Sequence, residues 1–145
     1  MVASEPHHTP SLLYSAKRLE LVIRARLDDM LRGSGVTTLQ YTALTVLEHR
    51  DGVTAAQLAR DSFVTPQSMS DMLRALEANS LISRSANPAS RRELLVHLTE
   101  RGVALLEKFA PKAKAIEDQM THGMDATAAQ TFRTDLTTGW SNLRK

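Results

Sequence analysis

The chain has 145 residues and a formal net charge of +2, with 42% hydrophobic and 23% charged residues. These values are ordinary for a globular protein, and this length is sufficient to bury a core as one domain. We therefore expect a single domain over residues 1–145. Cysteine is absent, which excludes disulfides, thiolate metal sites and cysteine-based redox sensing.

No apolar run approaches the roughly 18 residues that a membrane span needs, and the first residues lack the basic start and apolar core of a secretory signal. We expect a cytoplasmic protein with no membrane contact. The adjacent His7 and His8 could ligate a metal, but the five histidines together show no ligand spacing. We therefore expect no metal and no cofactor. The small net charge argues only weakly for a nucleic-acid partner, so local charge matters more.

Apolar residues recur every three or four positions from about residue 11 to residue 31, which predicts an amphipathic helix. Gly33-Ser34-Gly35 should end it. Leu21, Val22 and Leu31 widen the apolar surface beyond one stripe. A helix that is apolar on more than one side indicates two packing partners, one of which could be a second subunit. The alternative is a helix deep in the core of a monomer.

Two capping boxes mark the next helices. Thr37 and Gln40 form the first box and predict a helix that runs to Arg50, where Asp51-Gly52 breaks it. The second box, Thr54 to Gln57, predicts a short helix that ends near residue 62. A tight turn should join it to the following helix.

The helix expected over Thr65–Asn79 begins with a threonine N-cap and with proline at the first helical position. One face is apolar, and the opposite face is centred on Gln67, Asp71 and Arg74. Ser68 and Ser70 lie on the flanks of that polar face. Such a helix can pack against a core with its apolar face and lie in a DNA groove with its polar face. The apolar face consists of Met69, Met72, Leu73 and Leu76.

Two short strands are expected over residues 81–85 and 93–98, with a loop over residues 86–92 between them. From Ser83 to Arg92 the chain has three arginines and no acidic residue. This is the densest positive patch in the sequence, and it predicts a hairpin with a basic tip.

Two helices are expected after the hairpin. Thr99 should cap a long helix over about residues 100–121, in which Pro111 predicts a kink or a break near residues 107–110. Asp125 should cap a last helix. The chain therefore has one helix before the helix-turn-helix segment and two after the hairpin.

Short helices, a tight turn and a two-stranded hairpin with a basic tip together predict a winged helix-turn-helix. The fold class is mainly α with a small β-hairpin wing. Short polar side chains near a helix N-terminus can approach phosphates and base edges, and arginine can pair with guanine or enter a minor groove. The alternative is that these residues are solvated faces of a small helical protein. The candidate DNA contacts are Thr38, Thr65, Pro66, Gln67, Ser68, Ser70, Asp71, Arg74, Arg91 and Arg92.

The segments VTTLQYTALTVL, from Val36, and NPASRRELLVHLTERG, together with the helix pair between them, resemble the MarR (multiple antibiotic resistance regulator) family of bacterial transcription factors. The resemblance covers nearly the whole chain. Its most specific part is the wing followed by the junction from Leu98 to Gly102. It implies dimers formed by helices at about residues 11–33 and 100–145, with a DNA-binding lobe over about residues 36–98.

The resemblance also implies that the helix over residues 65–79 enters a major groove and that Arg91 and Arg92 belong to the wing. Arg92 occupies the usual minor-groove position. The family usually has an aspartate two residues before that arginine, whereas this chain has Ser90. The aspartate is thought to brace the arginine, so the aim of Arg92 is in question here. The positive charge is intact, and DNA binding is still expected.

We expect a homodimeric repressor of a palindromic operator in double-stranded DNA, with half-sites one helical turn, about 10 base pairs, apart. The resemblance implies release by a small anionic or phenolic effector between the dimerisation helices and the DNA-binding lobe. Tyr14, Arg18 and Tyr41 are the candidate lining residues, because an aromatic ring and a cation suit such a ligand. Ordinary packing and surface charge are the alternative for each.

Three other classes were weighed. The sequence has no motif for an enzyme, so we expect none. A winged helix that docks proteins would keep the fold without needing the wing arginines. A sequence-tolerant architectural DNA binder would leave the polar face of the 65–79 helix with less purpose.

Overall fold

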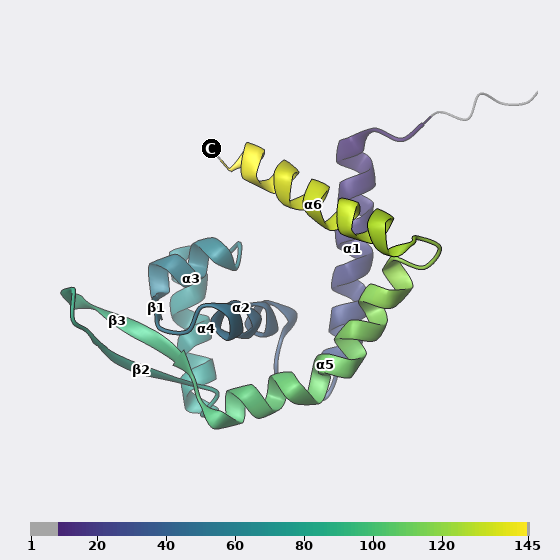
Figure 1. The fold of residues 1–145 in the computed structure, drawn as a ribbon. Coiled ribbons are helices and arrows are strands. Elements are labelled where there is room, and N and C mark those ends of the chain that lie inside the picture. The colour runs from purple at the N-terminus through teal and green to yellow at the C-terminus, as the bar shows by residue number, and fades with distance from the viewer. Residues whose placement is uncertain (1–8, 145) are drawn as a thin grey trace, which may run out of the picture. The chain divides into compact units, whose positions relative to one another are not determined.

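The computed structural model describes residues 9–144, so His7 and His8 lie outside the described residues. The chain divides at Pro111 into two compact units. The elements in chain order are α1 (Leu12–Leu31), α2 (Thr38–His49), β1 (Val53–Thr54), α3 (Ala55–Asp61), α4 (Pro66–Ala78), β2 (Ile82–Asn87), β3 (Ser90–Leu98), α5 (Glu100–Met120) and α6 (Ala126–Leu143) (Figure 1).

The helices begin where side chains can satisfy the open backbone amides of a first turn. The backbone amide of Gln40 donates to Thr37 Oγ1 (3.1 Å), and the backbone amide of Thr37 donates to Gln40 Oε1 (3.0 Å). The box at Thr54 has the same two bonds. Thr65 caps α4 by accepting from the Ser68 amide at 3.1 Å. The predicted helix starts are therefore confirmed, because they depend on residues only three positions apart.

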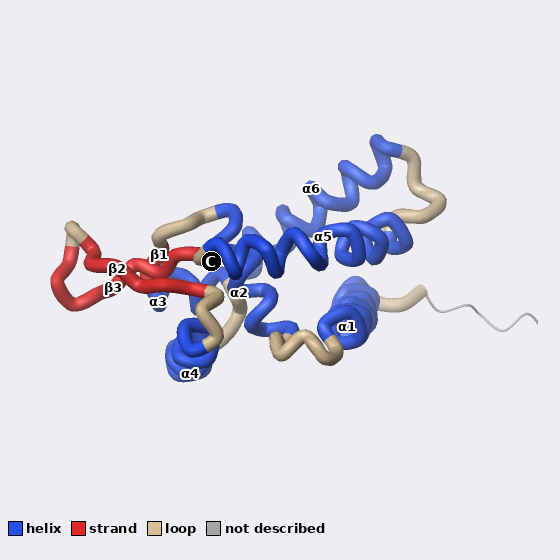
Figure 2. Tube along the Cα trace, turned by 90° about the horizontal axis from the view of Figure 1, so that it is seen from below, coloured by secondary structure: helices blue, strands red, loops and turns tan. Residues whose placement is uncertain are grey.

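The three strands form one antiparallel sheet in the order β1-β3-β2 (Figure 2). The third strand, β1, was not predicted; it pairs through Val53 opposite Val96. The predicted loop over residues 86–92 is wrong, because pairing continues to Asn87 opposite Ser90 and only two residues remain between the strands. The sequence could not show this, because backbone pairing between strands needs no particular side chain.

The wing has an irregular tip. Ala86 pairs with Leu94, yet the next residue on β2, Asn87, pairs with Ser90. The residues between these two pairs on β3, Arg91 to Glu93, therefore have no opposite residue and form a bulge. Both wing arginines thus lie in a strand bulge instead of a loop, and a bulge redirects side chains from the regular alternation.

The core of the first unit lies between α2, α3, α4, the sheet and the first half of α5. The apolar face predicted for α4 is confirmed, since three of its members are almost fully buried and Met72 is half-buried. The largest hydrophobic side chains that are nearly fully buried are Leu44, Leu47, Leu58, Met69, Leu73, Leu76 and Val96.

The junction from the sheet into α5 is tight. The Thr99 hydroxyl donates to the Ser80 carbonyl (2.6 Å) and accepts from the Gly102 amide (3.0 Å). A Cβ atom on Gly102 would lie 2.3 Å from the Leu81 carbonyl oxygen. The glycine therefore permits the first turn of α5 to pack directly against backbone, which explains the Thr-x-x-Gly pattern physically.

α5 continues without interruption through Pro111, so a break near residues 107–110 is wrong. Proline removes only one backbone donor, and the helix extends over 21 residues around it. The division of the chain into two units coincides with this proline.

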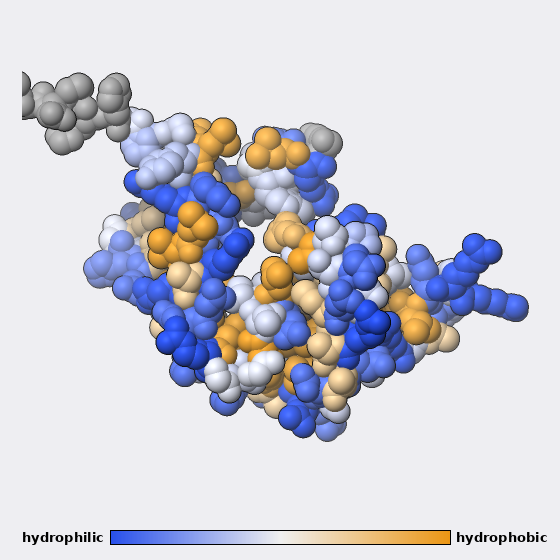
Figure 3. Space-filling model, turned by 180° about the vertical axis from the view of Figure 1, so that it is seen from behind, coloured by the Kyte–Doolittle hydropathy of each residue, from blue (hydrophilic) through white to orange (hydrophobic). Residues whose placement is uncertain are grey.

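The helices near the two ends bury little within the described chain. Leu31 is the one buried residue of α1, and α6 has none. Leu12 and Leu13 are 89% and 78% exposed, and apolar atoms are open on this helix in Figure 3. A position for α1 deep in a monomer core is therefore wrong. No helix within residues 9–144 is both long enough and apolar enough to cross a bilayer.

Candidate nucleic-acid interface

The N-terminal half of α4 presents the predicted polar face to solvent. Thr65 to Ser68 are exposed, as are Ser70, Asp71 and Arg74. The Thr65 hydroxyl also donates to Ser68 Oγ at 3.0 Å, which orders the first turn. The positive end of the helix dipole favours a phosphate here, while the side chains remain accessible to base edges.

Asp71 and Arg74 form an ion pair on this face, one turn apart. Both side chains are well exposed, so the pair contributes little to stability. The Asp71 carboxylate offsets the arginine charge and holds the guanidinium on the helix surface. A contact between Arg74 and guanine or phosphate stays a prediction, and it would require the guanidinium to leave this carboxylate.

The wing arginines are exposed at the bulge, and the wing forms a hydrophilic projection (Figure 3). The Asn87 side chain accepts from the Ala89 amide (3.0 Å) and shapes the turn. Ser90 Oγ accepts a long hydrogen bond, 3.4 Å, from the backbone amide of Arg92. Ser90 therefore holds the backbone that carries Arg92, whereas the usual aspartate is thought to brace the arginine itself.

The third arginine of the basic patch does not join the other two. Arg84 Nε donates to Glu77 Oε2 of α4 at 2.9 Å, and the arginine side chain is 28% exposed. Its charge is therefore paired with a carboxylate of the same lobe. The pair connects β2 to α4, and the sequence pattern missed it because residues 77 and 84 belong to different elements.

A chain of hydrogen bonds secures the base of the wing. Asp51 accepts from His97 Nδ1 (3.0 Å) and from the Leu98 amide (3.0 Å), and His97 Nε2 lies 2.7 Å from Ser85 Oγ. Partial burial alone would raise the pKa of Asp51, but the bonds from His97 and the Leu98 amide hold that pKa below its usual value. The turn after α2 is thereby fixed to β3 and, through Ser85, to β2.

Thr38 lies apart from the α4 face and the wing. It is in the first turn of α2, and its hydroxyl donates to the Asp28 carboxylate on α1. A nearby carboxylate repels phosphate, so this geometry favours a joint between α1 and α2 over a DNA contact. A role for Thr38 in DNA binding stays a prediction.

The three candidate effector residues do not surround one cavity in the described chain. Arg18 lies over the ring of Tyr14 at 5.5 Å, and both belong to α1. Tyr41 is only 8% exposed and meets Phe109 edge to face, with ring centroids 6.5 Å apart. Tyr41 is therefore a core residue, while Tyr14 and Arg18 lie on the surface.

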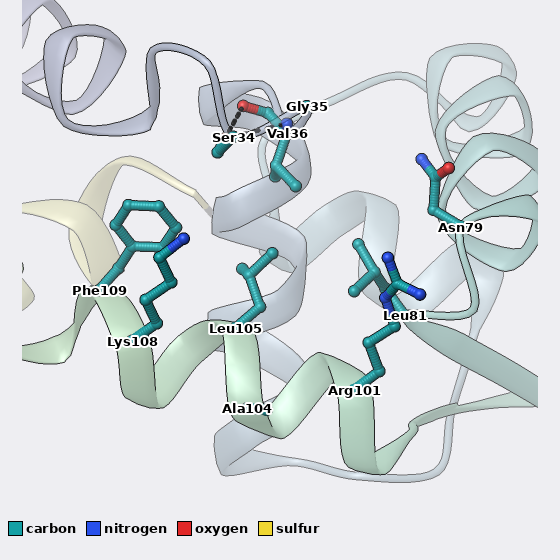
Figure 4. A pocket seen from close by; sticks show the side chains of 10 residues that line it. All are labelled: Ser34, Gly35, Val36, Asn79, Leu81, Arg101, Ala104, Leu105, Lys108 and Phe109. Carbon is teal, nitrogen blue, oxygen red and sulfur yellow. Dashed lines mark hydrogen bonds between the residues drawn. The ribbon is translucent and has the colours of Figure 1, made fainter.

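A cavity of about 350 Å³ opens instead between the α1–α2 loop, the end of α4 and the first half of α5 (Figure 4). Its apolar wall includes Val36, Leu81 and Leu105. In Figure 4, Arg101 extends from α5 toward Leu81, and Lys108 lies beside Phe109. Sequence reasoning missed both cations. Their seven-residue spacing, with Ala104 and Leu105 between them on the same helix face, was the available signal.

No group of three or more His, Asp or Glu residues within residues 9–144 is arranged to hold a metal ion.

Comparison with known proteins agrees with this geometry. Residues 36–94 match the model of the MarR family. A helix-turn-helix-type transcriptional repressor from Mycobacterium tuberculosis is 31% identical over 120 residues, which cover 83% of this chain and 86% of the relative.

Two solved structures are similar over most of their lengths. One is a MarR-family transcriptional regulator from Silicibacter pomeroyi, with a TM-score of 0.82, 26% identity and coverage of 90% of this chain and 88% of that one. The other is a MarR-family protein from M. tuberculosis in complex with salicylic acid, with a TM-score of 0.70, 30% identity and coverage of 90% and 97%.

The fold and the exposed polar helix beside a basic wing define a winged helix-turn-helix of the DNA-binding class. With the relatives above, the chain belongs to the MarR family and is a DNA-binding transcriptional regulator.

Proposed function

We propose that the protein is a homodimeric repressor that acts in the cytoplasm on a pseudo-palindromic operator. Each subunit inserts α4 into a major groove and its wing into the adjacent minor groove. The main support for this proposal is the exposed polar face of α4, centred on Gln67, Asp71 and Arg74. The wing adds two exposed cations, Arg91 and Arg92. The ion pair between Arg84 and Glu77 connects the wing to this helix.

The dimer is supported by the apolar surface of the end helices. Leu12, Leu13, Leu21 and Val22 are at least half-exposed on α1. On α6, Leu136, Trp140 and Leu143 are exposed, and no residue of this helix is buried. A second copy that covers such surfaces would give two lobes related by two-fold symmetry, which matches a palindromic site.

Footprinting on the DNA upstream of the protein's own gene tests this proposal. A protected site with dyad symmetry and half-sites about 10 base pairs apart supports the repressor. Uniform protection of all sequences supports the architectural binder instead. Absence of protection, with a protein captured on the α4 face, supports the docking module.

The wing assignment has its own test. Arg92→Ala should weaken binding and lower the salt slope by about one counterion. Arg24→Ala removes the same charge from α1, where Arg24 pairs with Glu20, and should leave the slope unchanged. Unchanged affinity of the Arg92 variant in moderate salt would remove Arg92 from the interface.

The base-reading assignment is separate. Gln67→Ala should change the preference among operator variants more than it changes non-specific affinity, because amide side chains read adenine by paired hydrogen bonds. An equal loss on all sequences would make Gln67 a backbone contact.

A small anionic or phenolic effector releases the DNA in this proposal. The M. tuberculosis relative solved with salicylic acid supports that ligand class. The cavity beside α5 supports it too, since two cations, Arg101 and Lys108, border an apolar wall. This cavity lies between the C-terminal end of α4 and α5. A bound effector can therefore shift the position of α4 relative to α5.

Salicylate titration compares the two candidate sites for that effector. Arg101→Ala and Lys108→Ala should weaken salicylate-induced release if the cavity is the site. Arg18→Ala should weaken it if the surface pair Tyr14 and Arg18 is the site in the dimer. Release that is equal in all three variants would contradict both sites.

A further inference from the structure

Two residues other than glycine have positive φ angles within the described chain, Phe63 and Ser80, both at 61°. Each follows the C-cap of a helix, where a left-handed residue lets its own backbone amide and that of the next residue bond back to the helix. The Val64 amide donates to the Ala59 carbonyl (3.1 Å), and the Leu81 amide donates to the Leu76 carbonyl (2.9 Å). The backbone therefore requires this conformation at both sites, and glycine adopts it most easily.

A phenylalanine at such a position is unfavourable for folding. Its Cβ atom is strained at positive φ, and the side chain of Phe63 is 71% exposed, so the ring gains little from burial. The neighbouring Val64 already fills the apolar role before the helix, since it is half-buried and packs against the core that contains Met69. The ring therefore has no evident use in the fold of the single lobe.

The position of Phe63 indicates what the ring contacts. It lies in the turn between α3 and α4, two residues before the Thr65 N-cap, at the end of α4 where Gln67 and Ser68 are exposed. An apolar ring beside base-reading polar groups matches the thymine 5-methyl group, which is the apolar feature of the major-groove edge. We propose that Phe63 is a specificity-determining residue that packs against a thymine methyl in each half-site. This inference rests on the proposed binding of α4 in the major groove.

Phe63→Gly is a favourable test, because it removes the ring and keeps the required backbone. Ser80→Gly is the matched control. It makes the same change at the other positive-φ position, which follows the C-terminal end of α4. The thermal midpoint of both variants should equal or exceed that of the wild type. If Phe63→Gly folds poorly, Phe63→Asn replaces it, since asparagine also tolerates positive φ.

The DNA probe is a duplex that carries the footprinted site, with single thymines replaced by deoxyuridine to remove only the methyl group. For the wild type, loss of one particular methyl per half-site should weaken binding by about fivefold, as for a modest base-edge contact. Phe63→Gly should bind the thymine duplex about fivefold more weakly and show no further loss on the deoxyuridine duplex. Ser80→Gly should behave as the wild type on both duplexes.

Other outcomes overturn the inference in distinguishable ways. Wild-type affinity of Phe63→Gly, beside an intact footprint, removes Phe63 from the interface and leaves the proposed function standing. Equal loss on both duplexes shows a contact to sugar or phosphate instead of the methyl. A changed oligomeric state with unchanged DNA affinity shows a protein contact. Absence of any footprint with the wild type overturns both the proposed function and this inference.

Discussion

The DNA-binding lobe and the end helices use their apolar residues in opposite ways. Within the lobe, leucines such as Leu44 and Leu73 are fully buried by neighbours from the same chain. On α1, leucines such as Leu12 and Leu13 are almost fully exposed, and α6 buries none of its residues. The lobe therefore completes its own core, whereas the end helices have apolar surface that folding of one chain leaves open. Stability and assembly should respond to different substitutions.

The largest effect should come from the centre of the lobe. Leu44→Ala removes a fully buried side chain and should lower the free energy of unfolding by about 2–5 kcal/mol through lost burial and a cavity. Urea denaturation measures this change. Leu39→Ala on the same helix is the control, since Leu39 is about half-exposed and should lose far less. Equal losses would contradict the self-sufficient core.

The junction between sheet and α5 should be the next most sensitive position. Gly102→Ala forces a Cβ atom against the Leu81 carbonyl and should cost about 1–3 kcal/mol of unfolding free energy, as overpacking does. Gly139→Ala in α6 is the control, because a Cβ atom there meets nothing within 4 Å. That variant should be neutral or more stable by up to about 1 kcal/mol, from helix propensity. Thermal and urea unfolding of both proteins separate the two sites.

Dimer formation should be weakened by a substitution that leaves the stability of the DNA-binding lobe unchanged. Leu13→Lys places a charge on the exposed apolar surface of α1 and should raise the dimer dissociation constant about tenfold or more, since burying a leucine contributes at least ~1.5 kcal/mol. Analytical ultracentrifugation measures the constant. Urea denaturation at a concentration where both proteins are monomeric should show unchanged lobe stability. An unchanged constant would mean that this part of α1 is outside the dimer interface.

The smallest expected effect is a pH dependence at the base of the wing. Because the folded pKa of Asp51 is held below the ordinary value of 3.8, its contribution to stability is present above that value and is lost as pH falls through the folded pKa. Asp51→Asn should therefore lose stability at neutral pH, by less than about 1 kcal/mol for so exposed a group. The difference from wild type should disappear at low pH. A difference that grows on acidification would contradict the hydrogen-bonded carboxylate.

Local features of the fold could be predicted from the sequence, and features that depend on distant residues could not. The caps at Thr37, Thr54 and Thr65 depend on residues three positions apart, so their helix starts were predictable. The two faces of α4 follow from helical periodicity, and burial confirms them. In contrast, β1 has two residues and forms only because β3 lies beside it.

The candidate site shows the same division. The exposure of Gln67 and Arg92 could be predicted because each lies on a polar segment. The pairing of Arg84 with Glu77 and the burial of Tyr41 against Phe109 are tertiary contacts, which residue type alone does not reveal. Arg101 and Lys108 were missed for a related reason: only the packing of three separate segments forms their cavity.

Because of the bulge at the wing tip, the length of the wing can change independently of the direction of the hairpin. Regular pairing from Ile82 to Ala86 and the pair between Arg84 and Glu77 set the direction of the hairpin relative to α4. The residues from Arg91 to Glu93 have no opposite residues, so insertions there would disturb no strand register. The tip is thus a position where the wing can become longer or shorter, in evolution or by design, while the orientation of α4 stays unchanged.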